Sequence, residues 1–210
     1  MRVAEKILLL LGGLFVMSAA AAQPDMPQTQ IVAEINRAAA EMRALECDFV
    51  QTKHISLMNE KMVSTGRMYY RQSDRLRWEY LSPYAYIFIL NGSNVTLKSE
   101  KRTDVIDIES NRIFSEIARI MMNSVTGRCL TDTSDFKAAI TASGDEWIAE
   151  LTPQKKELKQ MFRTVVLHFD RKSEVVREIE LIERSGDKTV IELKNIKKNQ
   201  TVDEKVFVVG

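Results

Sequence analysis

Residues 74–92, DRLRWEYLSPYAYIFILNG, decide the fold of this chain. In the first half, charged and apolar side chains alternate with a period of two: Arg75, Leu76, Arg77, Trp78, Glu79 and Tyr80. This alternation is typical of a strand with one buried and one solvated face. Ser82-Pro83 interrupts it, and residues 84–90 are then apolar on both faces, so both sides of this second strand must be covered. Asn91-Gly92 is a strong hairpin signal that turns the chain into a third strand.

The same patterns extend in both directions along the chain. Other segments with strand character are residues 47–51, 62–71, 95–97, 147–151, 164–169, 175–182, 189–196 and 206–209. Apolar residues at helical spacing predict a helix at residues 29–44 and a helical insert at residues 107–123. The polar connectors between neighbouring strands are mostly short, which favours an antiparallel meander. The predicted fold class is mostly β with helices (α+β), in which a strongly bent sheet wraps around the helices.

The N-terminal residues 1–22 have the layout of a secretory signal peptide. Arg2 and Lys6 precede an apolar run at residues 7–16, and SAAAAQPD follows with a cleavage point after Ala22. The apolar run is too short to span a bilayer comfortably, which disfavours the alternative of a retained membrane anchor. No cysteine stands at the cleavage point to carry a lipid. A single mature domain is expected at residues 23–210.

Charge and composition limit the classes of partner. Charged residues make up 28% of the chain, and the formal net charge is +1. Removal of the signal peptide brings this charge to about zero. A neutral balance does not argue for nucleic acid as a partner. The basic run of Lys155, Lys156, Lys159 and Arg163 fits a solvated loop, with docking to an acidic partner as the alternative.

Cys47 and Cys129 are the two cysteines of the chain. In an exported protein an even number of cysteines permits a disulfide, so a Cys47–Cys129 bridge is expected. The alternative is two buried thiols that pack as small hydrophobic groups. The distance between their Cα atoms decides between the two, and sequence does not supply it.

The sequence predicts neither an enzyme nor a resident metal or cofactor. His54 and His168 have no second ligand at metal-binding spacing, and His168 fits a solvent-facing position in a strand. No serine stands in a nucleophile elbow, and no glycine-rich phosphate loop occurs among the 8 glycines. Binding or transport is therefore the expected class of function.

The order of several motifs resembles the LolA family of periplasmic carriers of outer-membrane lipoproteins. These motifs are CDFVQTK at 47–53, STGRMYYRQSDRLRWEYLSPY at 64–84, IFILNGSNVTL at 87–97, DEWIAELTP at 145–153 and VDEKVFVV at 202–209. The resemblance runs over nearly all of the mature chain. It implies an incomplete antiparallel β-barrel that is closed by a helical lid over a hydrophobic cavity.

The resemblance also implies the residues that bind lipid. The expected lining of the cavity and of the lid is Phe49, Met68, Tyr70, Leu76, Trp78, Ile87, Ile89, Ile113, Ile117 and Met121. Many family members have an arginine that latches the lid where this chain has Gln72, between Arg71 and Ser73. Gln72 is expected to be a weaker latch because an amide donates without charge assistance.

As a member of this family, the chain is expected to carry acylated lipoproteins through the periplasm as a monomer. Its implied partners are an inner-membrane ABC transporter that releases lipoproteins and an outer-membrane acceptor. The alternative is a lipid-binding or sensor module of the same fold that acts on another acyl lipid, a glycolipid or a regulatory protein. Sensors of this kind usually add a C-terminal domain, for which the residues before Gly210 leave no room. The cargo itself stays open at this stage.

Overall fold

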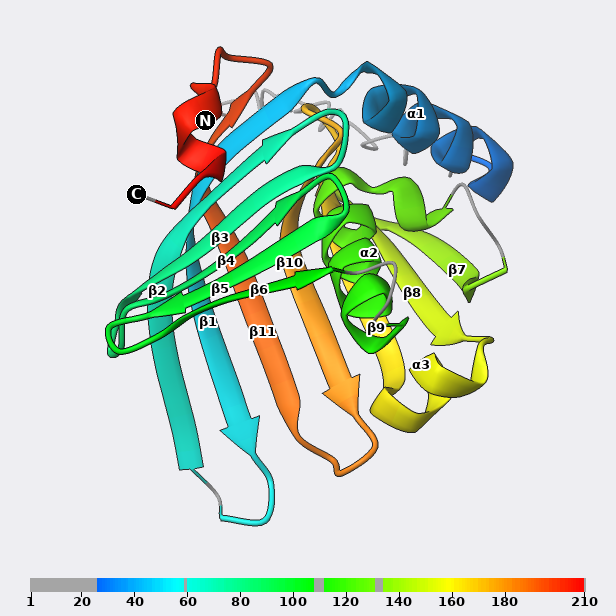
Figure 1. Ribbon diagram of the computed structural model, residues 1–210. Helices are drawn as coiled ribbons and strands as arrows, with labels where there is room; N and C mark the ends of the chain where they lie inside the picture. The colour runs from blue at the N-terminus through cyan, green and yellow to red at the C-terminus, as the bar shows by residue number, and fades with distance from the viewer. Residues whose placement is uncertain (1–25, 59, 108–111, 131–133, 210) are drawn as a thin grey trace, which may run out of the picture.

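A single antiparallel sheet of 11 strands dominates the computed structural model (Figure 1). The structure describes residues 26–58, 60–107, 112–130 and 134–209, and within helix α2 the side chains of residues 112–118 are not described. The predicted signal peptide at residues 1–22 lies outside the described residues. The predicted fold class, mostly β with helices, is confirmed.

Most strands follow one another with short connections, as the turn signals predicted. Their bounds are β1 (Ala44–Ile55), β2 (Glu60–Arg71), β3 (Arg75–Ser82), β4 (Tyr86–Asn91), β5 (Asn94–Ser99), β6 (Thr103–Asp107), β7 (Phe136–Ser143), β8 (Glu146–Pro153), β9 (Phe162–Asp170), β10 (Val175–Glu183) and β11 (Lys188–Lys198). The helices are α1 (Gln28–Glu41), α2 (Arg112–Thr126) and α3 (Lys156–Met161), with two 3₁₀ turns, η1 (Arg128–Leu130) and η2 (Glu204–Phe207). In contrast to the short connections, α2 and η1 lie between β6 and β7, and α3 lies between β8 and β9. The strand expected at residues 206–209 is wrong, because the chain forms η2 there.

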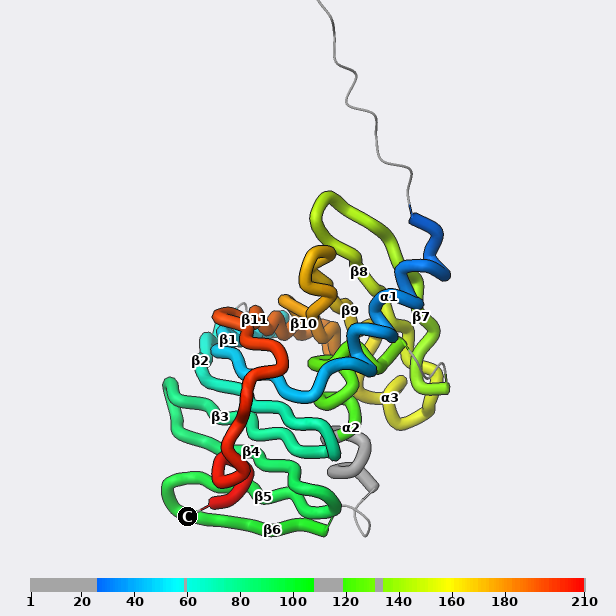
Figure 2. Tube along the Cα trace, turned by 90° about the horizontal axis from the view of Figure 1, so that it is seen from above, coloured from blue at the N-terminus to red at the C-terminus, as the bar shows by residue number. Residues whose placement is uncertain are grey.

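The sheet is open. Its strand order is β6-β5-β4-β3-β2-β1-β11-β10-β9-β8-β7, so β1 joins the two halves by pairing with β2 on one side and β11 on the other. Strands β6 and β7 form the two edges. Seen from above, the sheet bends so that the β2–β6 half and the β7–β9 half lie on either side of α2 (Figure 2). Of the predicted incomplete antiparallel β-barrel with a helical lid, the antiparallel and unclosed arrangement of the strands is therefore confirmed, and the lid stays a prediction.

Both faces of β4 are covered, as the apolar run at residues 84–90 required. Phe88 and Leu90 of β4 point into the main core on the concave face. Ile89 points to the opposite face, where it is 1% exposed and packs with Val202 and Phe207 of the C-terminal segment. This segment crosses the outside of β3 and β4 (Figure 2).

Polar contacts fix the C-terminal segment in place. Glu204 accepts hydrogen bonds from Arg71 at 2.8 Å and from Arg75 at 3.2 Å. Arg77 donates to the carbonyl oxygen of Val206 at 3.1 Å. The charged residues that alternate through the first half of the 74–92 stretch therefore hold a cover over the outer face of the sheet.

Gly66 and Phe49 form a close cross-strand pair at the centre of the concave face. They are Cα partners in the β1–β2 ladder. A Cβ atom at Gly66 would lie 2.0 Å from the carbonyl oxygen of Glu79 and 2.4 Å from Cζ of Phe49. The Phe49 ring occupies this space, with its centroid 4.6 Å from that of Trp78 and 5.2 Å from that of Tyr80. Glycine at this position lets three aromatic rings gather on one patch of sheet.

Candidate functional site

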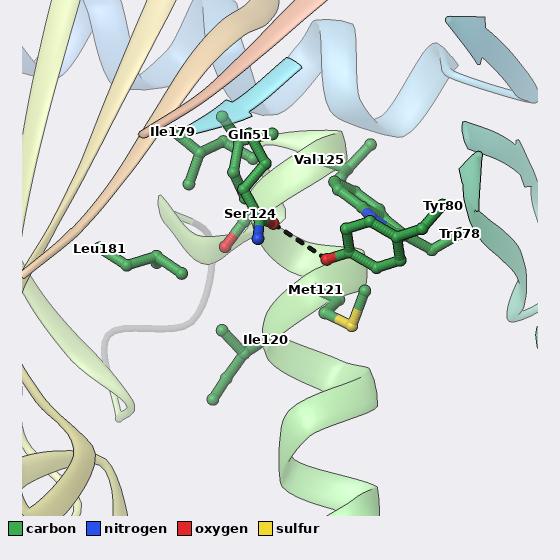
Figure 3. Close-up of a pocket in the computed structure, with 10 residues that line it drawn as sticks. Gln51, Trp78, Tyr80, Ile120, Met121, Ser124, Val125, Ile179 and Leu181 are labelled. Atoms are coloured by element: carbon green, nitrogen blue, oxygen red, sulfur yellow. Dashed lines mark hydrogen bonds between the residues drawn. The ribbon is translucent and has the colours of Figure 1, made fainter. Parts of the chain in front are cut away.

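A cavity of about 180 Å³ lies between helix α2 and the concave face of the sheet (Figure 3). Its lining comes from strands β1, β3, β10 and β11 and from one side of α2. The lining residues are Gln51, Trp78, Tyr80, Ile120, Met121, Ser124, Val125, Ile179, Leu181 and Ile191. The lining is mostly apolar with few polar groups, which is the usual character of a small-molecule binding site.

Helix α2 presents one face to this cavity because of the spacing of its residues. Ile120 and Ser124 are four residues apart, as are Met121 and Val125, so these two adjacent pairs lie on one side of the helix. Gly127 follows the helix with a φ of +77°, a left-handed conformation that glycine adopts without strain. The helix thus ends where the chain turns into η1 beneath α1.

A charged anchor holds the middle of α2 to the chain that follows it. Arg119 forms an ion pair with Asp135, whose side chain is 3% exposed. The ammonium group of Lys155 lies 2.7 Å from the same carboxylate. A buried carboxylate needs such partners because an unpaired charge is costly away from water. Lys155 of the basic run therefore pairs within the chain. The predicted loop is wrong for the rest of the run, because Lys156 and Lys159 lie exposed on α3 and Arg163 lies exposed on β9.

Two polar side chains in the mostly apolar lining of the cavity are joined by a hydrogen bond. The hydroxyl of Tyr80 donates to Oε1 of Gln51 at 2.9 Å (Figure 3). Burial raises the pKa of Tyr80, so the phenol stays protonated and remains a donor. The bond joins β3 to β1 across the floor of the cavity.

The predicted lining residues fall into four groups. Trp78 and Met121 line the cavity. Phe49, Met68, Tyr70 and Leu76 are fully buried on the same face of the sheet, within the main core. Their contact with lipid stays a prediction. Ile113 and Ile117 belong to α2, but their side chains lie outside the described residues.

Ile87 and Ile89 were assigned to the wrong face. They belong to the outer apolar cluster beneath the C-terminal segment, whereas Phe88 and Leu90 face the concave side. Successive side chains in a strand point to opposite faces, so a shift of one residue in the assignment places every side chain on the wrong face. Because residues 86–90 are apolar throughout, their pattern gave no sign of which set faced inwards.

Gln72 lies exposed in the turn between β2 and β3. Its backbone N–H donates to the carbonyl oxygen of Arg43 at 2.7 Å, which ties the turn to the residue before β1. The role of the Gln72 side chain as a lid latch stays a prediction. The described part of α2 is anchored by the ion pair between Arg119 and Asp135.

The expected disulfide is not formed. Cys47 and Cys129 are both free and buried, and both belong to the main hydrophobic core. They pack as small apolar side chains, the alternative that the sequence left open. Burial, reinforced by Asp48 and Glu46, raises the pKa of Cys47 to about 12. Burial likewise raises the pKa of Cys129 to about 12.

We expect neither thiol to react with a disulfide reagent in the native protein at pH 8. Only the thiolate is nucleophilic, and a pKa of about 12 leaves very little of it. In denaturant without reductant, both thiols should react. Colorimetric thiol titration checks this result. Failure to detect thiols after denaturation would show that the protein carries the bridge after all.

Several residues of the cavity had no assignment from the sequence. Gln51, Tyr80, Ile120, Ser124, Val125, Ile179, Leu181 and Ile191 were missed as site residues. Ile179 and Leu181 share one face of β10, and their period of two was visible in the sequence. Their meeting with α2 was not visible, because it depends on the bend of the sheet.

None of the helices described is both long enough and apolar enough to cross a membrane. An open antiparallel sheet that bends around a helix and encloses an apolar cavity is the class of architecture that these residues define. Residues 40–209 match the model of the outer membrane lipoprotein carrier protein LolA. The chain belongs to the LolA family.

Individual relatives are distant. The chain is 22% identical over 166 residues to an outer-membrane lipoprotein carrier protein of Nitrosospira multiformis, an alignment that covers 79% of this chain and 77% of the relative. A conserved protein of Thermus thermophilus has a similar fold, with a TM-score of 0.53, 10% identity and coverage of 85% of this chain and 91% of that one.

A second similar structure comes from the MucA/MucB complex of Pseudomonas aeruginosa. Its TM-score is 0.52 at 14% identity, and the alignment covers 86% of this chain but 61% of that one. At these identities the likeness to solved structures concerns the fold alone.

Proposed function

We propose that this protein binds the acyl chains of lipoproteins in the cavity beneath α2 and carries them from the inner to the outer membrane. The observation that carries the proposal is the apolar cavity between a helix and the concave face of an open sheet. The family is described as outer membrane lipoprotein carrier proteins, which supports the same role. The cargo is then an acylated lipoprotein, and α2 is the lid.

The size of the cavity supports a moving lid. Sites for small molecules commonly have volumes of about 300–1,000 Å³. The cavity is about 180 Å³, so acyl chains need more room, and the proposal requires α2 to move when they bind. Withdrawing a chain from water is favourable by about 0.8 kcal/mol per methylene group, which offsets the cost of displacing α2. Met121 suits this task because a flexible thioether side chain adapts to different contents.

The proposed route places the protein in the periplasm. The signal peptide at residues 1–22 would direct export and leave a mature chain from Gln23. An ABC transporter of the inner membrane would supply the lipoprotein, and an acceptor at the outer membrane would receive it. The affinity of the site for acyl chains must be close to that of a bilayer, because a site that held acyl chains much better would not release them at the outer membrane.

We expect Leu181→Glu to reduce bound lipid at least tenfold. Leu181 lines the cavity and is only partly buried, so its carboxylate can remain solvated while it places charge beside an acyl chain. Native mass spectrometry of the protein purified from the periplasm, followed by lipid extraction, measures the occupancy. The extraction also identifies the cargo.

Val105→Glu is the matched control for this experiment. Val105 is 67% exposed on edge strand β6 and does not line the cavity. This variant should keep the lipid of the unmodified protein. Equal lipid content in Leu181→Glu and Val105→Glu, with both variants folded by circular dichroism, would contradict the assignment of the cavity.

A second function on the same fold is a sensor that binds a regulatory protein. The observation that favours it is the similar sheet of MucB, which is known in complex with MucA. A sensor would retain its protein partner when Leu181→Glu has lost its lipid. Comparing the proteins that co-purify with this variant and with the unmodified chain separates the two functions.

A further inference from the structure

His168 faces two carboxylates on the outer face of the sheet, away from the cavity. It lies on β9 and is the Cα partner of Glu178 on β10. Its Nε2 atom is 3.7 Å from Oε1 of Glu178 and 3.8 Å from Oε1 of Glu180. The three ligand atoms lie within 4.8 Å of one another. The sequence gave no sign of this group, because the pairing of β9 with β10 brings together residues that are ten or more positions apart.

The imidazole ring is oriented by a third carboxylate. Oε2 of Glu146, on β8, lies 2.9 Å from Nδ1 of His168. A carboxylate accepts only, so in the neutral imidazole Nδ1 carries the proton and Nε2 presents its lone pair. Arg177 pairs with the other oxygen of Glu146 and fixes the carboxylate in turn. A histidine held in this way by a carboxylate is the usual second sphere of a metal-ligating imidazole.

The Nε2 atom needs a partner. It is buried, and no hydrogen bond to it is found within the described part of the chain. The ammonium group of Lys188 forms an ion pair with Oε2 of Glu180 at 2.8 Å. The other oxygen of Glu180, Oε1, faces the imidazole. Three carboxylates stand beside two basic side chains here, so the surroundings favour an added cation.

We propose that His168, Glu178 and Glu180 bind a divalent transition-metal ion of the Zn²⁺ class. Ligand bonds of about 2.0–2.2 Å at tetrahedral angles place neighbouring ligand atoms about 3.4 Å apart. The separations of 3.7 and 3.8 Å from Nε2 of His168 reach that value with movements of a few tenths of an ångström. The two glutamate oxygens lie within 4.8 Å of each other, and rotation of these partly exposed side chains brings them together. An imidazole with two carboxylates suits zinc better than Mg²⁺ or Ca²⁺, which prefer oxygen ligands alone. Three protein ligands leave the fourth position to water or to an external group.

Titration calorimetry of the EDTA-treated mature protein with ZnCl₂ tests the site. We expect one Zn²⁺ per chain, no comparable binding of MgCl₂, and an intense visible absorption when Co²⁺ is used as a tetrahedral probe. His168→Gln and Glu178→Gln should each weaken Zn²⁺ binding more than tenfold. Glu146→Gln should weaken it by about 10–100-fold through the lost orientation of the ring.

Glu192→Gln is the matched control. Glu192 lies on β11 as the Cα partner of Glu178, and its carboxylate pairs with Lys194 at 3.1 Å. The Glu192→Gln variant should bind Zn²⁺ with the same affinity as the unmodified protein. Circular dichroism establishes that each variant is folded. Absence of Zn²⁺ binding to the unmodified protein, or unchanged affinity in folded His168→Gln, would overturn the proposal.

Discussion

Gly66→Ala is expected to destabilise the protein by about 3 kcal/mol or more, at the upper end of the range for overpacked cores. The added Cβ atom would lie 2.0 Å from a backbone oxygen, that of Glu79, and 2.4 Å from the ring of Phe49. A side-chain end can move away from such a contact, but a backbone atom held in the β2–β3 ladder cannot. The free energy of unfolding in guanidinium chloride, compared with that of the unmodified protein, measures the effect.

Gly144→Ala separates steric crowding from the loss of glycine itself. Gly144 has a φ of +57°, and no atom lies within 4 Å of the position of an added Cβ. Its substitution should cost only about 1–2 kcal/mol, from the left-handed backbone conformation. Equal losses of stability in the two variants would mean that the Phe49 ring and the β3 backbone accommodate a methyl group at residue 66.

Alkaline pH is expected to unfold the protein well before its backbone is damaged. The pKa values of Cys47 and Cys129 are raised from 9.0 to about 12 in the folded state. Above pH 9 the unfolded chain therefore loses thiol protons that the native protein keeps, and stability falls as pH rises. Each thiol contributes about 1.4 kcal/mol per pH unit until its folded pKa is reached. Unfolding in urea at a series of pH values from 8 to 11 measures this slope.

A Cys47→Ala, Cys129→Ala double variant is the control for the alkaline slope. Burial also raises the pKa values of Tyr70 and Tyr80, whose ordinary value is 10.0, so tyrosine adds to the effect at higher pH. Between pH 8 and 10 the double variant should lose most of the dependence. If its slope matched that of the unmodified protein in this range, the thiols would not be its cause.

Much of the sheet was predictable because alternation and turn chemistry act locally. The charged and apolar residues of 75–80 placed β3, and Asn91-Gly92 placed the turn after β4. Both depend on neighbours two to four residues away, which the sequence displays directly. The same reasoning failed at Val206–Val209, where an apolar pattern of strand type forms a 3₁₀ turn because it packs across the sheet.

The site was less accessible to prediction because it depends on contacts between distant segments. Trp78 and Met121 were identified through the family resemblance, whereas Leu181 and Ile191 required the bend that brings β10 and β11 towards α2. Ile89 shows a second limit. A strand with two apolar faces has no polar side to reveal its orientation. Only the packing of Phe207 against Ile89 in the folded protein shows which side chains of β4 face outwards.

The position of β1 at the junction of the sheet has a consequence for how the protein is made. Its partners are β2, the next strand along the chain, and β11, the last one. During synthesis the second partner emerges after almost everything else, so the central ladder is completed late. Contacts between such distant segments slow folding through the entropy of closing a long loop. Slow folding of this kind leaves β1 with only one of its two partners for much of the folding process, so its other edge stays open to pairing with another chain.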